Sequence, residues 1–279
     1  MASFTIALTS DALFSLVEGN AVYPTGAAFP FVKALTKVNE KLSKLDQAIE
    51  ERFKIVLITN NLDMDRLNKS IQNHNLNIDQ IYEITAKKCL SEHLNDLKPV
   101  LYLSTDSKNV KEAINAGYGA ATMSQGDYDE PSDDMLRVAF DGDGILFSDE
   151  SEKVFKQDGL EAFLQNEERL ENEALQIGPL SEFAKALLVM QKKFPKSCPI
   201  RTYLVTSRGT GSCGIRSLMS LRKRGLGINE ALLLDGSHKG QILKAIKPHI
   251  FFDDQQKHVN GALENRVVGA HVPFGELNN

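Results

Sequence analysis

Two aspartates one residue apart, Asp141 and Asp143, follow a run of apolar residues in the stretch VAFDGDGILF, residues 138–147. Such a run predicts a buried strand, and the carboxylates come where that strand should end. Like charges this close are unfavourable unless a cation or a proton lies between them. A hard cation such as Mg²⁺ takes oxygen ligands, commonly one or two carboxylates with water and a phosphate group. The pair therefore indicates metal-assisted chemistry at a strand end.

Three more polar positions follow or flank apolar segments further along the chain. Thr206 ends TYLVT, Lys239 lies in GSHKGQILKAIKP, and Asp253 and Asp254 follow HIFF. Ligands of an open parallel sheet bind outside the carboxyl ends of its strands, so we expect these side chains to meet the first aspartate pair in one pocket. Each motif alone is weak, because a strand-end threonine is usually a cap and a lone lysine is usually solvated. Their shared position favours a catalytic site.

Phosphoryl transfer is the chemistry that this set allows. Asp141 is the expected nucleophile and would form an aspartyl phosphate. Asp143 would protonate the departing oxygen and then take a proton from the attacking water. Thr206 supplies a hydroxyl donor, Ser207 a backbone N–H, and Lys239 a positive charge for the phosphoryl oxygens.

Composition restricts the class of protein and its partners. The chain has 279 residues, of which 42% are hydrophobic, enough for one large core or two ordinary ones. The net charge of −5 and the absence of a long Lys/Arg run argue against a nucleic-acid polymer or an anionic membrane as partner. No apolar stretch approaches the ~18 residues of a membrane span. The first residues lack the basic segment of a signal peptide, and three cysteines without a CxxC pair suggest reduced thiols, so we expect a cytoplasmic protein.

The sequence reads as two similar halves, each a succession of strand, helix, strand, helix, strand. The matched segments, in chain order, are 5–14 with 138–147, 26–42 with 178–194, 53–61 with 200–208, 97–106 with 246–255, and 108–122 with 257–271. Any two βαβ segments share an apolar rhythm, but the common order and the shared FxKAL and KP details favour a duplication. We therefore predict an α/β fold of two Rossmann-like parallel-sheet units, residues 1–130 and 131–279, with helices on both faces.

The two halves differ where the chemistry should be. Thr9 stands at the position of the expected nucleophile, and Ser104 and Thr105 replace the second aspartate pair. The first half is therefore expected to be non-catalytic, serving as scaffold, subunit interface or effector site. The second half has an additional charged, helix-prone segment at about 149–177, which predicts a small helical cap over the strand ends; a pair of solvated surface helices is the alternative.

The order Asp-x-Asp, strand-end Thr, Lys, Asp-Asp resembles the four motifs of the haloacid dehalogenase superfamily of Mg²⁺-dependent phosphatases. LRVAFDGDGILFSDESE (136–152), CPIRTYLVTSR (198–208) and IKPHIFFDDQ (246–255) are similar to segments of the cytosolic 5′-nucleotidase I family. The similarity continues through FVKAL (31–35) and IVLITNN (55–61), so it covers most of the chain.

This resemblance implies hydrolysis of nucleoside 5′-monophosphates, AMP prominently, with Mg²⁺ as cofactor. It implies that the metal is held by Asp141, by the carbonyl group of Asp143 and by the acidic pair, with Asp254 favoured over Asp253 as the direct ligand.

The resemblance also bears on the substrate. Arg208 and Ser212 fit the family pattern in the loop after the second motif, where with Ser207 they would line the substrate phosphate or sugar. The motifs do not fix the base; Phe147, Phe155 and Phe163 are candidates for stacking, although aromatic residues at such positions more often belong to the core.

Two alternatives stay open: a phosphatase of the same superfamily that acts on sugar phosphates, and a nucleotide-sensing scaffold with residual hydrolysis. The loop Thr59-Asn60-Asn61, at a matching strand end of the first half, suggests a nucleotide effector site. A catalytically empty duplicate is also a natural interface, so a homo-oligomer is expected.

Overall fold

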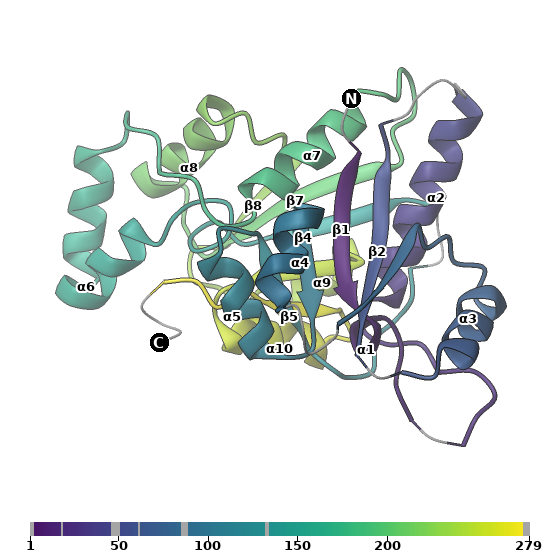
Figure 1. The fold of residues 1–279 in the computed structure, drawn as a ribbon. Helices are drawn as coiled ribbons and strands as arrows, with labels where there is room; N and C mark the ends of the chain where they lie inside the picture. Colours follow the sequence, from purple (N-terminus) through teal and green to yellow (C-terminus); the bar gives the residue numbers. More distant parts are fainter. Residues whose placement is uncertain are drawn as a thin grey trace.

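The computed structural model describes residues 3–17, 19–45, 51–60, 62–84, 89–131 and 134–275. Within these ranges ten strands form one sheet, in the order β3-β2-β1-β4-β5-β10-β9-β6-β7-β8 (Figure 1). The strands are β1 (Phe4–Thr9), β2 (Phe53–Thr59), β3 (Gln80–Glu83), β4 (Leu101–Ser104), β5 (Ala120–Met123), β6 (Leu136–Phe140), β7 (Ile200–Thr206), β8 (Glu230–Leu233), β9 (Ile250–Asp253) and β10 (Gly269–His271). The helices are α1 (Ser10–Leu13), α2 (Phe29–Leu45), α3 (Met64–Asn73), α4 (Leu90–Leu97), α5 (Ser107–Asn115), α6 (Glu150–Arg169), α7 (Ser181–Gln191), α8 (Ser212–Lys223), α9 (Gly240–Ile246) and α10 (Gln256–Glu264).

The two halves of the sheet have the same strand order. Outward from the middle, β5-β4-β1-β2-β3 is matched by β10-β9-β6-β7-β8. Strand pairs within each half are parallel, and β5 and β10, which join the halves, are antiparallel. The register agrees as well, since Leu8 pairs with Leu103 as Phe140 pairs with Phe252. The predicted α/β class with a largely parallel sheet is confirmed, and this matched order is what a duplication would produce.

The antiparallel junction separates the carboxyl ends of the two halves. Because each half is parallel within itself and the halves run in opposite directions, their carboxyl ends lie at opposite edges of the sheet. The first-half corner that follows β1 and β4 is therefore remote from the aspartates that follow β6 and β9.

Helices cover both faces of the sheet, as the continuous apolar strands require. In α2 the apolar face of Phe31, Leu35, Val38 and Leu42 is buried. In α7 the corresponding residues Phe183, Leu187 and Met190 are buried too. Phe194 lies beyond the end of α7 at Gln191 and packs on the core from the segment that follows the helix.

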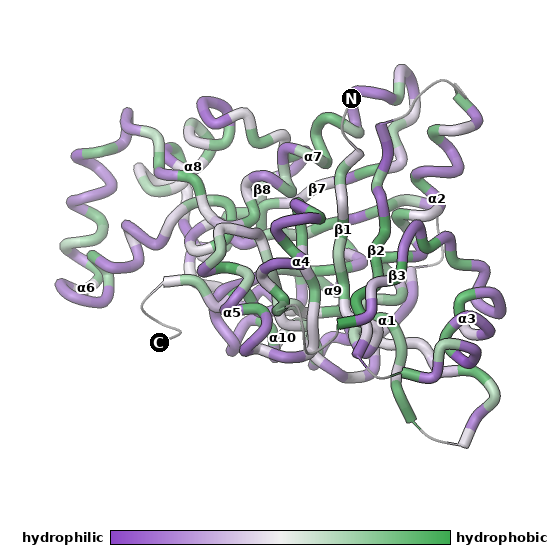
Figure 2. Tube along the Cα trace, in the orientation of Figure 1, coloured by the Kyte–Doolittle hydropathy of each residue, from purple (hydrophilic) through white to green (hydrophobic). Residues whose placement is uncertain are grey.

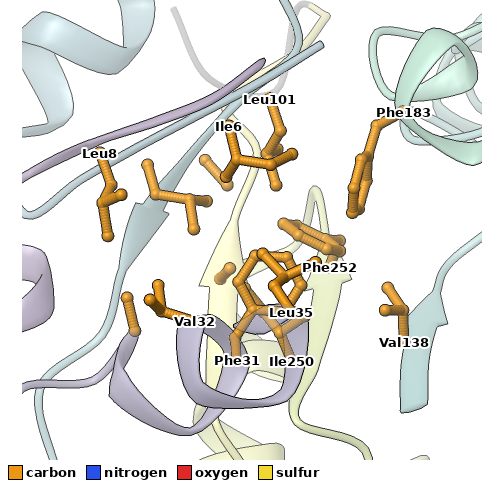
Figure 3. Packing of buried hydrophobic residues seen from close by; sticks show 14 of the residues in the cluster. Ile6, Leu8, Phe31, Val32, Leu35, Leu101, Val138, Phe183, Ile250 and Phe252 are labelled. Atoms are coloured by element: carbon orange, nitrogen blue, oxygen red, sulfur yellow. The ribbon is translucent and has the colours of Figure 1, made fainter. Parts of the chain in front are cut away.

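One face of the sheet carries a core shared by both halves (Figure 3). The ring centroid of Phe183 in α7 lies 6.1 Å from that of Phe31 in α2 and 6.0 Å from that of Phe252 in β9. On the other face, a separate cluster forms under α4 and α5, and another under α9 and α10. Figure 2 shows the apolar residues concentrated along the strands and the polar residues on the outer helices. The division of the chain near residue 130 stays a prediction.

The additional segment of the second half is helical. It forms α6, which packs against α8 and projects from one end of the molecule (Figure 1). At Gly159 the backbone has φ +83°, so the helix is broken into two pieces there. None of the helices in the described ranges has both the length and the apolar character that a membrane crossing requires.

Candidate active site

A buried lysine lies between the aspartate that follows β6 and the aspartate that ends β9. The Nζ atom of Lys239 lies 2.8 Å from Oδ1 of Asp141 and 2.7 Å from Oδ2 of Asp253. Asp141 directly follows β6 and Asp253 ends β9, and these strands are neighbours in the sheet. Lys239, which contacts both aspartates, is the residue that precedes α9. Residues that are far apart in the sequence thus meet at the carboxyl ends of the strands, as the motif order predicts.

The turn after β6 is tightly packed against two more of the expected site residues. A Cβ atom on Gly142 would lie 3.5 Å from the hydroxyl oxygen of Thr206. A Cβ atom on Gly144 would lie 2.8 Å from Cγ of Asp254, and Gly144 has φ +73°. Glycine is therefore required at position 144 both by the backbone conformation and by the close approach of Asp254. Thr206 and Asp254 both border the aspartate turn.

The two aspartates at the end of β9 have different surroundings. Asp253 accepts hydrogen bonds from Lys239, from the backbone N–H of Gln255 at 2.9 Å, and from Nδ1 of His258 at 3.1 Å to each oxygen. Asp254 is buried as well, but its Oδ1 atom has no hydrogen-bond partner among the described residues. Its backbone carbonyl lies 2.9 Å from Nε2 of His271. The oxygens of Asp253 are thus occupied by hydrogen bonds within the protein, whereas among the described residues nothing occupies the Oδ1 atom of Asp254, which could bind a ligand.

The pKa values follow from these contacts. Burial, together with repulsion from Asp141, Asp253 and Glu152, raises the pKa of Asp254 to about 9, although Lys239 opposes this. Burial also raises the pKa of Asp141 to about 7, although Lys239 opposes this. Burial would raise the pKa of Asp253 too, but Lys239 and His258 outweigh burial and hold it below its usual range. A cation placed among these groups would relieve the repulsion at Asp254.

These carboxylates suit a hard cation. Asp141, Asp253 and His258 each offer a ligand atom within 4.8 Å of the others, but the ammonium of Lys239 already bridges the two aspartates. Asp254 lies instead beside the turn that carries Asp143, with its Cγ and Oδ2 atoms against Gly144, and its Oδ1 atom has no hydrogen-bond partner among the described residues. Carboxylate oxygens are ligands that fit Mg²⁺. His258 contacts Asp253 rather than Asp254.

Arg208, expected to line the substrate phosphate or sugar, contacts two carboxylates. Its guanidinium donates to both oxygens of Asp143 at 2.7 Å, and on its other side it pairs with Glu167 from α6. Burial lowers the pKa of Arg208, but the two carboxylates outweigh burial and raise it above its ordinary value. In this arrangement Arg208 holds the expected acid/base residue rather than an open binding surface.

A cavity of about 330 Å³ lies beside the loop after β7, which is within the range of small-molecule sites. Its walls come from the end of α6, the β7–α8 loop and the turn after β8, and they consist of Leu164, Glu168, Gly209, Thr210, Gly211, Ser212, Cys213 and Asp235. Ser212, one of the expected substrate residues, is therefore at this cavity. Ser207 is exposed at the start of the same loop.

Of the aromatic residues considered for base stacking, Phe147 is fully buried in the core. Phe155 and Phe163 are neighbours on α6, with ring centroids 6.2 Å apart, and Phe155 is exposed. The ring of Phe163 lies 5.5 Å from the guanidinium of Arg208.

The equivalent corner of the first half contains mainly hydroxyl groups. The hydroxyls of Thr9 and Ser104 are 3.5 Å apart, and that of Ser10 donates to Thr59 at 3.2 Å. Asp11, the one carboxylate retained, accepts a hydrogen bond from Thr105. The loop suggested as an effector site extends to Asn61, which lies outside the described residues.

Comparison with known proteins gives the family. A family model described as 5′-nucleotidase matches residues 20–279 of the chain. The chain belongs to the 5′-nucleotidase family. It is also 43% identical, over 96% of its length, to human cytosolic 5′-nucleotidase 1B, and it spans 48% of that longer protein. The resemblance seen in the sequence motifs is thereby confirmed.

One residue that contacts the site of this 5′-nucleotidase family member, Glu167, was not identified from its sequence. Glu167 is buried, like Ser151, in a charged helix that is otherwise exposed or half-buried, and it pairs with Arg208 and Arg216. Nothing in the pattern of charges distinguishes Glu167 from its solvated neighbours. No signal in the sequence could have found it, because the arginine partners of Glu167 are known only from the fold.

Proposed function

We propose that this chain is a Mg²⁺-dependent 5′-nucleotidase of the haloacid dehalogenase type, which hydrolyses nucleoside 5′-monophosphates, AMP favoured, to a nucleoside and phosphate. The observation that carries the proposal is the corner at β6 and β9, where Asp141 is paired with Lys239 and the neighbouring Asp254 has an oxygen with no partner in the described part of the chain. Residues 131–279 would be the catalytic unit with a cap at about 149–177, and residues 1–130 a non-catalytic unit.

Asp141 is proposed as the nucleophile. The contacts that the described residues make to its carboxylate, from Lys239 and from the backbone N–H of Gly142, both fall on Oδ1, which leaves Oδ2 for attack. In the first step, Oδ2 forms a bond to phosphorus and the bond from phosphorus to the 5′ oxygen breaks. The departing oxygen keeps the electron pair and takes a proton from Asp143, so the nucleoside leaves and Asp141 carries the phosphoryl group.

In the second step, water attacks phosphorus while Asp143 takes back a proton. The bond between phosphorus and Asp141 breaks, which releases inorganic phosphate and restores the enzyme. Lys239 and the hydroxyl of Thr206 would bind the phosphoryl oxygens, with the backbone N–H of Ser207 as a further donor.

Asp141, Asp254 and the carbonyl group of Asp143 would hold the Mg²⁺ ion, which when bound neutralises part of the phosphate charge. Asp253 is the less suitable ligand because its oxygens already accept hydrogen bonds from Lys239, Gln255 and His258. Its proposed role is to hold Lys239 beside the nucleophile.

The cavity beside the β7–α8 loop is the proposed place for the nucleoside, with Ser212 on its wall. Arg208 borders the same loop, but its pairing with Asp143 favours an indirect part in binding. A nucleotide effector, a homo-oligomeric state and a cytoplasmic location remain predictions.

The test is a phosphate-release panel that compares nucleoside 5′-monophosphates with ribose 5-phosphate and glucose 6-phosphate, each with Mg²⁺ and with EDTA. We expect release from nucleotides, strongest with AMP, that EDTA abolishes. Asp141→Asn removes the nucleophile at constant size and should show no release. Equal turnover of the sugar phosphates would favour the sugar phosphatase, and nucleotide binding without turnover in Mg²⁺ would favour a sensing scaffold.

A further inference from the structure

The cap helix α6 is attached to the rest of the protein largely by ion pairs, although Val154 and Phe163 are half-buried. Its apolar residues Phe155, Leu160 and Leu164 are exposed at 42%, 60% and 50%. Glu167, in contrast, is fully buried. Hydrophobic burial therefore contributes little to fixing the position of this helix. A buried carboxylate such as that of Glu167 needs partners of opposite charge.

Glu167 finds those partners in two buried arginines. One of its oxygens pairs with Arg208, which follows β7. The other lies 2.7 Å from Nη1 of Arg216 in α8 and accepts a hydrogen bond of 2.7 Å from the hydroxyl of Ser151. Arg216 also pairs with Glu150, at the start of α6, at 2.9 Å. Both ends of the cap helix are thus tied to the same arginine pair.

Arg208 connects this network to the catalytic turn. Its Nε and Nη2 atoms each donate to Asp143 at 2.7 Å, while Nη1 faces Glu167 and donates to the carbonyl of Cys213 at 3.0 Å. The planar guanidinium therefore has a fixed orientation, with one edge for each carboxylate. Asp143 itself lies between Gly142 and Gly144 in the turn after β6.

We infer that Glu167 and Arg208 are positioning residues for Asp143, so that proton transfer to the leaving group depends on the cap being seated on the core. This inference rests on the proposed function. Glu167 fixes the guanidinium, and the guanidinium fixes the carboxylate that must meet the 5′ oxygen. A misplaced proton donor slows the departure of a poor leaving group, because an alkoxide cannot depart without a proton.

A comparison of two leaving groups tests the inference. AMP is compared with its analogue that has sulfur in place of the bridging 5′ oxygen, because a thiolate is stable enough to leave without a proton. The measured quantity is kcat/KM, which includes steps up to release of the nucleoside. For Glu167→Gln we expect kcat/KM for AMP to fall about tenfold or more, and for the sulfur analogue less than about threefold. The matched control is Glu161→Gln, an exposed glutamate on the same helix, which should change neither value.

The ratio of the two values also protects the test against unfolding, because a smaller folded fraction lowers both rates equally. Arg208→Lys keeps the charge, but lysine cannot donate two parallel hydrogen bonds to Asp143. This variant should therefore shift the ratio of the two kcat/KM values in the same direction. Equal loss for both substrates, or no loss for either, in both variants would overturn the inference. A wild-type protein that releases no phosphate from AMP in Mg²⁺ would instead overturn the proposed function.

Discussion

The Nζ atom of Lys239 lies 2.8 Å from the Oδ1 atom of Asp141, in a corner from which water is largely excluded. The same ammonium lies 2.7 Å from Asp253, so it is the cation that both carboxylates share. Breaking a buried charge pair by removing one partner leaves the other charge uncompensated, which costs more than the pair itself contributes.

Replacement of Lys239 with methionine should therefore reduce both stability and activity. We expect the free energy of unfolding to fall by about 3–5 kcal/mol, because two buried aspartates lose their shared cation. Urea unfolding measures this loss. Phosphate release should fall at least about 100-fold, since a charge that stabilises the transferred group is gone. Lys244→Met, an exposed lysine on the same helix, is the control, and an unchanged unfolding midpoint for Lys239→Met would contradict this account.

The dependence of the free energy of unfolding on pH should differ between the metal-free and the Mg²⁺-bound protein. The folded-state pKa values of Asp254, about 9, and Asp141, about 7, lie above their unfolded values, so the folded protein binds more protons. This contribution to stability is fully present below the unfolded pKa, near 4, and is lost as pH rises towards 9.

In EDTA, urea unfolding from pH 6 to 9 should therefore show the free energy of unfolding falling by about 1 kcal/mol per pH unit. Mg²⁺ binds the ionised carboxylates, so the stabilisation that it adds should grow over the same range. In Asp254→Asn the fall should be smaller and the added stability from Mg²⁺ should disappear. A Mg²⁺ effect lost in Asp253→Asn but kept in Asp254→Asn would assign the ligand to the other aspartate.

Much of this fold was accessible from the sequence because burial imposes a pattern on it. The apolar strands that end at Asp141, Thr206 and Asp253 predict both the parallel sheet and the meeting of these residues, since strand ends on one edge converge. The repeated segments likewise predict the matched strand order of the two halves. The single continuous sheet through β5 and β10 was not predicted, because a pairing of three-residue and four-residue strands leaves little trace in composition.

The segment that forms α6 shows the limit of such reasoning. Its helical character follows from its composition, but the burial of Glu167 depends on Arg208 and Arg216, which belong to other parts of the chain. A charge becomes structural only when a specific partner is brought to it. The expectation that Arg208 lies at the substrate stays a prediction, whereas its contacts with Asp143 and Glu167 could not be predicted because sequence spacing does not connect these residues.

Gly144 gives a sharper test of the metal corner. Alanine there meets two penalties, because φ is +73° and the new Cβ atom would lie 2.8 Å from Cγ of Asp254. Gly225 has φ +67° with no atom within 4 Å of a Cβ atom, so Gly225→Ala should show only the backbone cost of about 1 kcal/mol. Gly144→Ala should lose more, and it alone should weaken the rise in melting temperature with Mg²⁺, measured by differential scanning fluorimetry. Equal Mg²⁺ responses in the two variants would show that Asp254 is not displaced.

The proposed nucleoside cavity can be filled without straining the backbone. Gly211 lies on the cavity wall with φ −69° and ψ −161°, and no atom lies within 4 Å of a Cβ atom placed on it. Gly211→Leu should therefore fold normally while its side chain occupies space that the nucleoside needs. We expect KM for AMP to rise about tenfold, a loss of about 1.4 kcal/mol in binding, while KM for p-nitrophenyl phosphate changes less than about threefold. Steady-state kinetics with both substrates measures this difference, and an equal rise in both KM values would mean that the cavity serves the phosphate or the loop rather than the nucleoside.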